Sequence, residues 1–205
     1  MKPNQIGFYA ADILLPDFEK TNGTLWATVA CDQFTSEPAY WESVENAVKD
    51  APSTLRMILP EVYLNEAEKR VPVINRAMNE ISDGVLQCYP DSMIYLERVQ
   101  SDGRIRRGIV ACVDLECYDY RVGSNSLIRA TEGTVLERIP PRVAIRRDAP
   151  LELPHIMLLI DDKDRTVIEP LFDALSSTAP EYDAQLYQNM GRLTGWAVTD
   201  AALLE

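Results

Sequence analysis

The positively charged side chains of this acidic chain are concentrated in one segment, residues 101–150. The segment holds nine arginines, no lysine and seven acidic residues, so its net charge is +2, whereas the rest of the chain carries −14. A planar guanidinium donates paired hydrogen bonds to a phosphate or a carboxylate, which a lysine ammonium does not. The segment therefore predicts either an anion-binding site or a set of ion pairs with nearby acids. The arginines are Arg104, Arg106, Arg107, Arg121, Arg129, Arg138, Arg142, Arg146 and Arg147.

Position along the segment separates these two interpretations for some of the arginines. The first three, Arg104, Arg106 and Arg107, fall on an expected hairpin strand, which favours ion pairs with acids across the hairpin. For three later arginines anion binding and ion pairing both stay open: Arg129, Arg138 and Arg142.

The stretch GSNSLIRATEGT, residues 123–134, strengthens the anion-binding interpretation. Small polar residues and two glycines surround Arg129 and Glu132, so backbone N–H groups can approach an anion closely. We expect Ser124 and Thr131 to take part. The stretch matches neither the dinucleotide-binding glycine motif nor a Walker A loop.

The same stretch also has a purely structural interpretation. Residues 123–126 have the composition of a turn, and residues 131–137 suit the start of the next helix. The sequence alone leaves both interpretations open.

The only histidine of the chain, His155, precedes the apolar run at residues 156–160. Such a histidine at a strand start is more often structural than catalytic, but it stays a catalytic candidate. Three carboxylates follow this run and either coordinate Mg²⁺ or form a solvated turn, which we favour. They are Asp161, Asp162 and Asp164.

Familiar zinc sites and hydrolase triads are not supported by the sequence. Four cysteines without C-x-x-C spacing and a single histidine do not assemble a structural zinc set. We interpret the thiols as reduced and buried. No nucleophile elbow or Ser-His-Asp arrangement occurs. The cysteines are Cys31, Cys88, Cys112 and Cys117.

Composition predicts a globular protein with a substantial core. The chain has 205 residues, of which 46% are hydrophobic and 25% charged, and this length suits a single domain. A net charge of −12 argues against nucleic acid or an anionic membrane surface as partner. The sequence shows no signal-peptide pattern and no apolar run of membrane-spanning length, so we expect a cytoplasmic protein.

The elements that would position these residues follow from local patterns. Residues 25–31 form a short apolar run that predicts a buried strand ending at Asp32. Ser36 is the expected N-cap of a helix whose buried side is formed by Trp41, Val44 and Val48.

Further along the chain, helical periodicity predicts a helix over residues 65–81, and Ser101-Asp102-Gly103 predicts a hairpin turn between two strands. Two more helices are expected at residues 140–149 and 165–175. Strands are expected at residues 154–162 and 195–200, with a helix beginning at 201. Antiparallel pairing with interleaved helices indicates an α+β fold, with a mixed, largely antiparallel sheet and flanking helices.

Longer strings of the sequence are more specific than any of these motifs. The most distinctive are ACDQFTSEPAYW at residues 30–41 and IRATEGTVLERIPPR at residues 128–142. With ADILLP, STLRMILPEVYL, RRGIVACVDLECYDY and LELPHIMLLIDD, in this order, they resemble the N-terminal half of the DUF1015 family, a domain of unknown function, in its longer bacterial type.

The resemblance implies more than a fold. Full-length relatives carry a Gly-Asp-Gly-Asn-His-Ser segment that resembles the phosphate-contacting box of ParB and sulfiredoxin-like proteins, and some relatives are ATP-dependent kinases of free serine. That segment is absent from the 205 residues. We therefore expect the N-terminal part of a longer architecture, or a naturally shortened protein, that is inactive alone.

The resemblance also suggests roles for the candidate residues. Asp32 or Glu132 would act as base or hydrogen-bond acceptor for a substrate hydroxyl, while the guanidinium groups of Arg129, Arg138 and Arg142 would bind phosphate or a substrate carboxylate. The full-length protein would use ATP and Mg²⁺ to phosphorylate a hydroxy amino acid such as L-serine.

The second interpretation is a non-catalytic ParB-like module that binds a ligand or takes part in regulation. In either case the expected partner is a small-molecule substrate or a nucleotide, and a homodimer is a further expectation. DNA binding by analogy with ParB is disfavoured by the net charge of −12.

Overall fold

The core of the fold is a five-stranded antiparallel sheet in which β3 is the central strand. The computed structural model describes residues 7–130 and 133–204. The first half of β3 pairs with β2, and its second half lies between β4 and β9. β8 extends the sheet beyond β9. The strands are β2 (Ala11–Pro16), β3 (Leu86–Val99), β4 (Ile105–Val110), β8 (Tyr182–Gln185) and β9 (Arg192–Val198).

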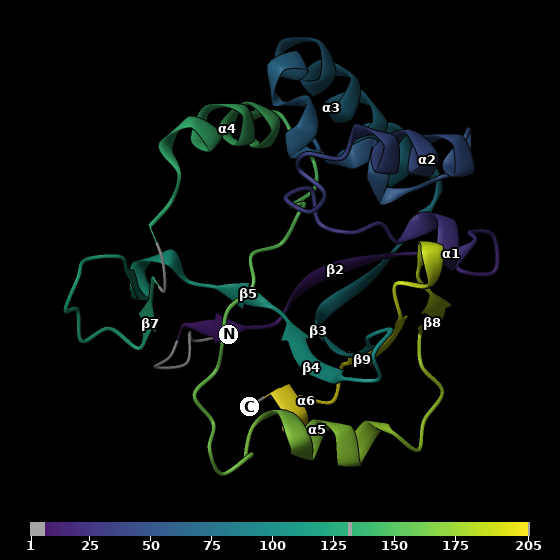
Figure 1. The fold of residues 1–205 in the computed structure, drawn as a ribbon. Helices are drawn as coiled ribbons and strands as arrows, with labels where there is room; N and C mark the ends of the chain where they lie inside the picture. Colours follow the sequence, from purple (N-terminus) through teal and green to yellow (C-terminus); the bar gives the residue numbers. More distant parts are fainter. Residues whose placement is uncertain (1–6, 131–132, 205) are drawn as a thin grey trace.

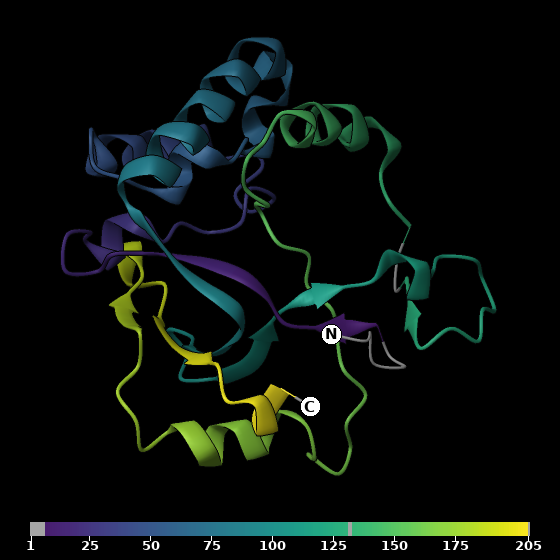
Figure 2. The same ribbon diagram turned by 180° about the vertical axis from the view of Figure 1, so that it is seen from behind.

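Two short strand pairs lie outside this sheet. β1 (Phe8–Tyr9) pairs antiparallel with β5 (Cys112–Val113). β6 (Tyr118–Asp119) pairs in parallel with β7 (Ile128–Arg129). In Figures 1 and 2 the β6–β7 pair projects from one end of the molecule, away from α2 and α3.

Helices cover the sheet from two sides. α2, α3 and α4 gather on one side, and α5 and α6 lie on the opposite side (Figures 1 and 2). The helices are α1 (Gly23–Trp26), α2 (Pro38–Val48), α3 (Ala67–Gly84), α4 (Ile139–Arg147), α5 (Ile168–Leu175) and α6 (Ala201–Leu204). Short 3-10 helices are η1 (Thr54–Met57), η2 (Glu61–Glu66), η3 (Leu115–Cys117), η4 (Leu136–Arg138) and η5 (Tyr187–Asn189).

Three apolar clusters form the core of the part of the chain that the structure describes. One joins α3 to α4 through Met78 and Ile145. A second packs α5 onto the sheet around the fully buried Tyr95. The third surrounds Trp41, which α2 buries against Cys31. The helix at 65–81 is confirmed, since α3 buries Ile74, Met78 and Ile81 as its periodicity predicts. The predicted hairpin, the helix after Pro140 and the α+β class are also confirmed.

The predicted strand at residues 25–31 is wrong. Its first two residues, Leu25 and Trp26, belong to α1, because the side chain of Asn22 accepts hydrogen bonds from the first free N–H groups of that helix. After α1 the backbone is held by a side chain instead of a strand: Thr54 Oγ1 donates to the carbonyl of Trp26 at 2.8 Å and accepts from the N–H of Thr28 at 3.1 Å. A strand partner is therefore not needed to satisfy these groups.

Three other local predictions also need correction. Ser36 is not the N-cap of α2, because Glu37 occupies that position without a side-chain cap and Pro38 fixes the first turn. Residues 156–160 are irregular and exposed, not a strand, since no strand of the described residues pairs with them. The helix predicted from residue 165 begins at Ile168.

Candidate functional site

The centre of the candidate site is a buried carboxylate that holds two arginines. Glu61 begins η2, and only 5% of its side-chain surface is exposed. Arg142 Nη2 donates a hydrogen bond to its Oε1 at 2.9 Å, and Arg138 Nη2 lies 3.0 Å from its Oε2. The two arginines are four residues apart where η4 continues into α4, so they project from one face of the helix. This arrangement holds both guanidinium groups at one place.

The two guanidinium groups retain capacity for an external anion. Each is about two-fifths exposed, at 41% for Arg138 and 42% for Arg142. A guanidinium carries five N–H donors, and each of these arginines contacts Glu61 through one nitrogen. Two positive charges against one negative charge leave a net charge of +1. A phosphate or a carboxylate matches both the free donors and this charge.

Asp32 lies next to this cluster through the loop that follows α1. The N–H of Glu61 donates to the carbonyl of Cys31 at 2.8 Å. Burial raises the pKa of the Cys31 thiol, the Asp32 carboxylate raises it further, and the Arg142 guanidinium opposes this shift. Asp32 and Arg142 therefore act on the same thiol from nearby positions. The Asp32 side chain itself is exposed, with Gln33 Nε2 at 3.5 Å.

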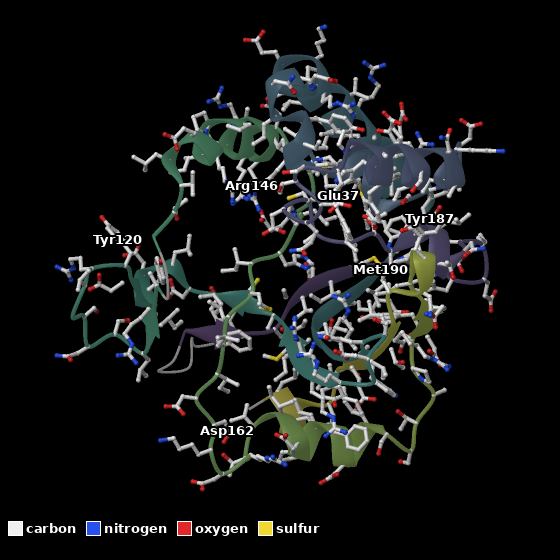
Figure 3. All side chains as sticks on the ribbon, in the orientation of Figure 1. Glu37, Tyr120, Arg146, Asp162, Tyr187 and Met190 are labelled. Atoms are coloured by element: carbon white, nitrogen blue, oxygen red, sulfur yellow. The ribbon has the colours of Figure 1, made fainter. Side chains whose placement is uncertain are left out.

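The segment that contains His155 is attached to the same helix. Arg146 of α4 donates from Nε to Glu152 at 2.9 Å and from Nη2 to the carbonyl of Pro154, also at 2.9 Å. In Figure 3 Arg146 and Glu37 lie on the side of the sheet that α2 and α4 occupy. His155 follows this anchor and is exposed. The structure thus places His155 near the α4 anchor but does not bring it into contact with Glu61.

Other predicted residues lie elsewhere. Ser124 Oγ accepts from the N–H of Ser126 at 3.0 Å, and the N–H of Ser124 donates to the carbonyl of Arg121 at 3.1 Å, so this stretch forms a turn. Arg129 is exposed on β7 and forms no ion pair with any residue that the structure describes.

The β6–β7 projection keeps Ser124 and Arg129 away from α4. Figure 1 shows this separation, and Tyr120 marks the projection in Figure 3. Thr131 and Glu132 lie outside the described residues. Of the predicted anion-binding residues, the structure therefore brings together Arg138 and Arg142 but not Ser124 or Arg129.

Several remaining arginines form ion pairs with acids close in the fold. Arg107 pairs with Glu97 across the β3–β4 hairpin at 2.9 Å, and Arg104 pairs with Asp102 at 2.6 Å. This confirms the ion-pair interpretation for both. Arg106 instead lies with its Nη1 3.6 Å from the sulfur of Met157.

The sequence prediction missed Glu61, which organises the site. It is a single acid between apolar residues in LPEVYL, and that isolation is a weak signal, because a lone acid among buried residues needs a partner. Its partners come 77 and 81 positions later, beyond the range of any local pattern.

A groove lies between α3 and α4, and its lining includes Glu137 and Pro141, the residues that directly precede Arg138 and Arg142 in the chain. It has a volume of about 530 Å³ and is largely apolar, with the carboxylates Glu68 and Glu137 in its lining. The other lining residues are Leu64, Ala67, Val71, Pro72, Pro140, Pro141 and Ala144. Its size falls within the range of small-molecule sites, about 300 to 1,000 Å³.

A family model described as "Protein of unknown function (DUF1015)" matches residues 16–205. The chain belongs to the DUF1015 family. The match spans the Cys31–Asp32 loop, Glu61 and the whole of α4. The predicted resemblance to the DUF1015 family is therefore confirmed.

No curated protein and no solved structure matches the chain. Among the described residues no group of three or more histidine, cysteine, aspartate or glutamate side chains gathers as a metal site. The described helices also include none that is long and apolar enough to cross a membrane.

Proposed function

We propose that the arginine pair held by Glu61 binds the anionic group of a small-molecule substrate or nucleotide. The observation that carries this proposal is the pairing of Arg138 and Arg142 on one buried carboxylate, with both guanidinium groups still partly exposed. The reaction we propose is ATP-dependent phosphoryl transfer to a hydroxy amino acid such as L-serine. Support for this reaction comes from the family resemblance, and support for the anion site comes from the geometry.

In this proposal the carboxylate of Asp32 accepts the proton, or a hydrogen bond, from the substrate hydroxyl. Phosphoryl transfer depends mainly on positioning and on stabilising negative charge. Arginines fixed by a carboxylate provide both without reorganising when the ligand binds. A carboxylate close to them suits the acceptor hydroxyl, since it can orient that group.

ATP requires a phosphate cradle and normally Mg²⁺. The Gly-Asp-Gly-Asn-His-Ser segment of the resemblance does not occur in the 205 residues, and no metal-ligand group gathers in the described part of the chain. We therefore assign no residue of this chain to Mg²⁺. In the proposed reaction this chain binds the anionic group through Arg138 and Arg142 and orients the acceptor hydroxyl through Asp32.

Binding experiments test the anion site. Calorimetric titration with inorganic phosphate, ATP and L-serine is expected to show binding of at least one of them. Arg142→Gln should weaken that binding at least tenfold, because a bidentate donor is lost. Arg104→Gln is the matched control, since Arg104 is 77% exposed and pairs only locally with Asp102. Equal effects of the two substitutions would contradict the proposal.

Turnover experiments test the reaction. ATP consumption is measured with a panel of hydroxy amino acids in a longer form of the protein that carries the Gly-Asp-Gly-Asn-His-Ser segment, because we expect the 205-residue chain alone to be inactive. Asp32→Asn should abolish turnover while the protein stays folded and still binds phosphate. Absence of turnover with every acceptor would remove the kinase assignment and leave the anion site.

The α3–α4 groove favours a second candidate, a non-catalytic ligand-binding module. Its volume of about 530 Å³ and its apolar lining suit a small apolar ligand better than phosphate. Ala144→Trp would occupy part of this groove and narrow it. If Ala144→Trp abolishes binding of a ligand and Arg142→Gln does not, the module interpretation is the better one.

A further inference from the structure

Five consecutive apolar side chains lie exposed between α4 and α5. Their exposed fractions range from 44% to 80%, although soluble chains seldom present apolar side chains in such a run. They are Ile156, Met157, Leu158, Leu159 and Ile160. We refer to residues 156–160 as the apolar segment.

The backbone of the apolar segment is open as well. It forms no helix or strand, and it shares no backbone–backbone hydrogen bond with any residue in the described ranges. In Figures 1 and 2 the stretch that leads to α5 runs along the margin of the molecule. Unpaired N–H and C=O groups in an extended stretch are a template for another strand.

Both ends of the apolar segment are anchored. On one side Arg146 donates to the carbonyl of Pro154 at 2.9 Å. On the other side the carboxylate of Asp162 accepts from the N–H groups of Thr166 and Val167 at 3.0 and 2.9 Å. An anchored, extended segment has less conformational entropy to lose when a strand pairs with it.

The sequence of the apolar segment is complementary to itself when two copies run antiparallel. With Leu158 opposite Leu158, Ile156 lies opposite Ile160 and Met157 opposite Leu159. The same register places His155 opposite Asp161. Apolar pairs at the centre and a histidine–carboxylate pair at each end are favourable cross-strand neighbours.

We propose that two copies of this chain associate through the apolar segment as an antiparallel strand pair with its twofold axis at Leu158. A twofold contact uses the same surface on both copies, and strand addition supplies main-chain hydrogen bonds along with apolar contact. A stable interface buries about 800 Å² on each partner. The dimer interface must therefore also bury surface next to the five apolar side chains.

Charge opposes this association and makes it dependent on salt. Each copy carries a net charge of −12, and the two copies repel each other over long range. Since salt screens that repulsion but leaves apolar burial intact, dimerisation should strengthen as ionic strength rises.

Sedimentation velocity of the 205-residue chain tests the proposal. The wild type is expected to shift from monomer to dimer as concentration rises. Leu158→Asp places two carboxylates face to face on the axis, and the dissociation constant should increase at least tenfold. Val143→Asp is the matched control, because Val143 is 48% exposed on α4, close to the 44% of Leu158. Circular dichroism verifies that each variant is folded.

Mixing charge variants tests the predicted register. Leu158→Asp and Leu158→Lys should each be monomeric alone and should form a heterodimer when mixed, since opposite charges then meet on the axis. A wild type that remains monomeric at every concentration would overturn the proposal. So would a Leu158→Asp variant that dimerises like the wild type, or a mixture that stays monomeric.

Disulfide cross-linking provides a measurement that does not depend on a destabilised variant. In the predicted register Leu158→Cys brings two thiols opposite each other, and mild oxidation should produce a covalent dimer. Ile156→Cys places its two thiols about 13 Å apart along the strands, given about 3.3 Å per residue, so it should not cross-link above the wild-type background. Equal cross-linking of both variants would refute the register.

Discussion

Replacement of Glu61 by glutamine tests whether the buried carboxylate organises the arginine pair. The substitution keeps the shape of the side chain and removes its charge. The new amide oxygen can still accept one hydrogen bond, but the ion pairs with Arg138 at 3.0 Å and Arg142 at 2.9 Å are lost. The cluster that joins η2 to α4 should therefore weaken.

The magnitude follows from the exposure of the three side chains. A hydrogen bond to a charged group contributes about 1.5 to 3 kcal/mol, and Glu61 makes two such contacts with only 5% of its side chain exposed. The arginines are about two-fifths exposed, so water compensates part of their loss. We expect Glu61→Gln to lower the free energy of unfolding by about 2 kcal/mol.

Urea unfolding measures this change, with Glu152→Gln as the control. Glu152 pairs with Arg146, also on α4, but its side chain is 66% exposed, so its substitution should cost less than about 0.5 kcal/mol. The slope of the unfolding free energy against urea should stay unchanged in both variants. If Glu61→Gln costs no more than Glu152→Gln, the buried carboxylate does not hold the cluster together.

Three further predictions concern other parts of the chain. Gly191→Ala should lower the free energy of unfolding, measured in urea, by more than about 3 kcal/mol, because φ is +103° and a Cβ would clash with the carbonyl oxygen of Val99. The control is Gly103→Ala, which should cost only about 1 kcal/mol, since φ is +82° and nothing lies within 4 Å of the added Cβ. Equal losses in the two variants would refute the clash. Cys88 and Cys112 are exposed, so the prediction of buried thiols is wrong for these two, whereas Cys31 is buried and burial raises the pKa of its thiol. Cys31 should therefore react with iodoacetamide far more slowly than Cys88 and Cys112; mass spectrometry of the labelled peptides measures this, and rapid labelling of Cys31 at neutral pH would contradict the packing. The Arg192 guanidinium lowers the pKa of Asp183 below its ordinary 3.8. This pair therefore stabilises the protein above about pH 4, and the stabilisation is lost as the pH falls through the lower folded-state pKa. Asp183→Asn should reduce the melting temperature at about pH 6 but leave it nearly unchanged at the acid end of the folded range, and an equal loss at both pH values would refute the linkage.

Local patterns predicted those elements whose stability depends on nearby residues. The 3.6-residue periodicity around Met78 predicted α3, and Ser101-Asp102-Gly103 predicted the β3–β4 hairpin, as the structure confirms. Both patterns hold because helix and hairpin contacts join residues that are close in sequence. Pro140 and Pro141 likewise predicted the helix that begins there, α4, because a proline favours the first turn of a helix.

Strand predictions failed where the deciding partner was distant. Residues 25–31 are as apolar as a buried strand, but Thr54 satisfies the backbone after Trp26. The apolar segment likewise has a strand composition and no strand partner among the described residues. An apolar run shows that a stretch avoids water, but a strand forms only when a neighbouring edge supplies hydrogen bonds.

The sequence by itself determined the α+β class, the regular helices, the hairpin and membership of the DUF1015 family. It also directed attention to the arginines of residues 101–150. Only the tertiary structure decided that Arg138 and Arg142 converge on Glu61, while Arg129 stays on the β6–β7 projection. The physical reason is that a buried charge is stabilised by whichever opposite charge the packing of helices brings near it, and that packing is a property of the whole fold.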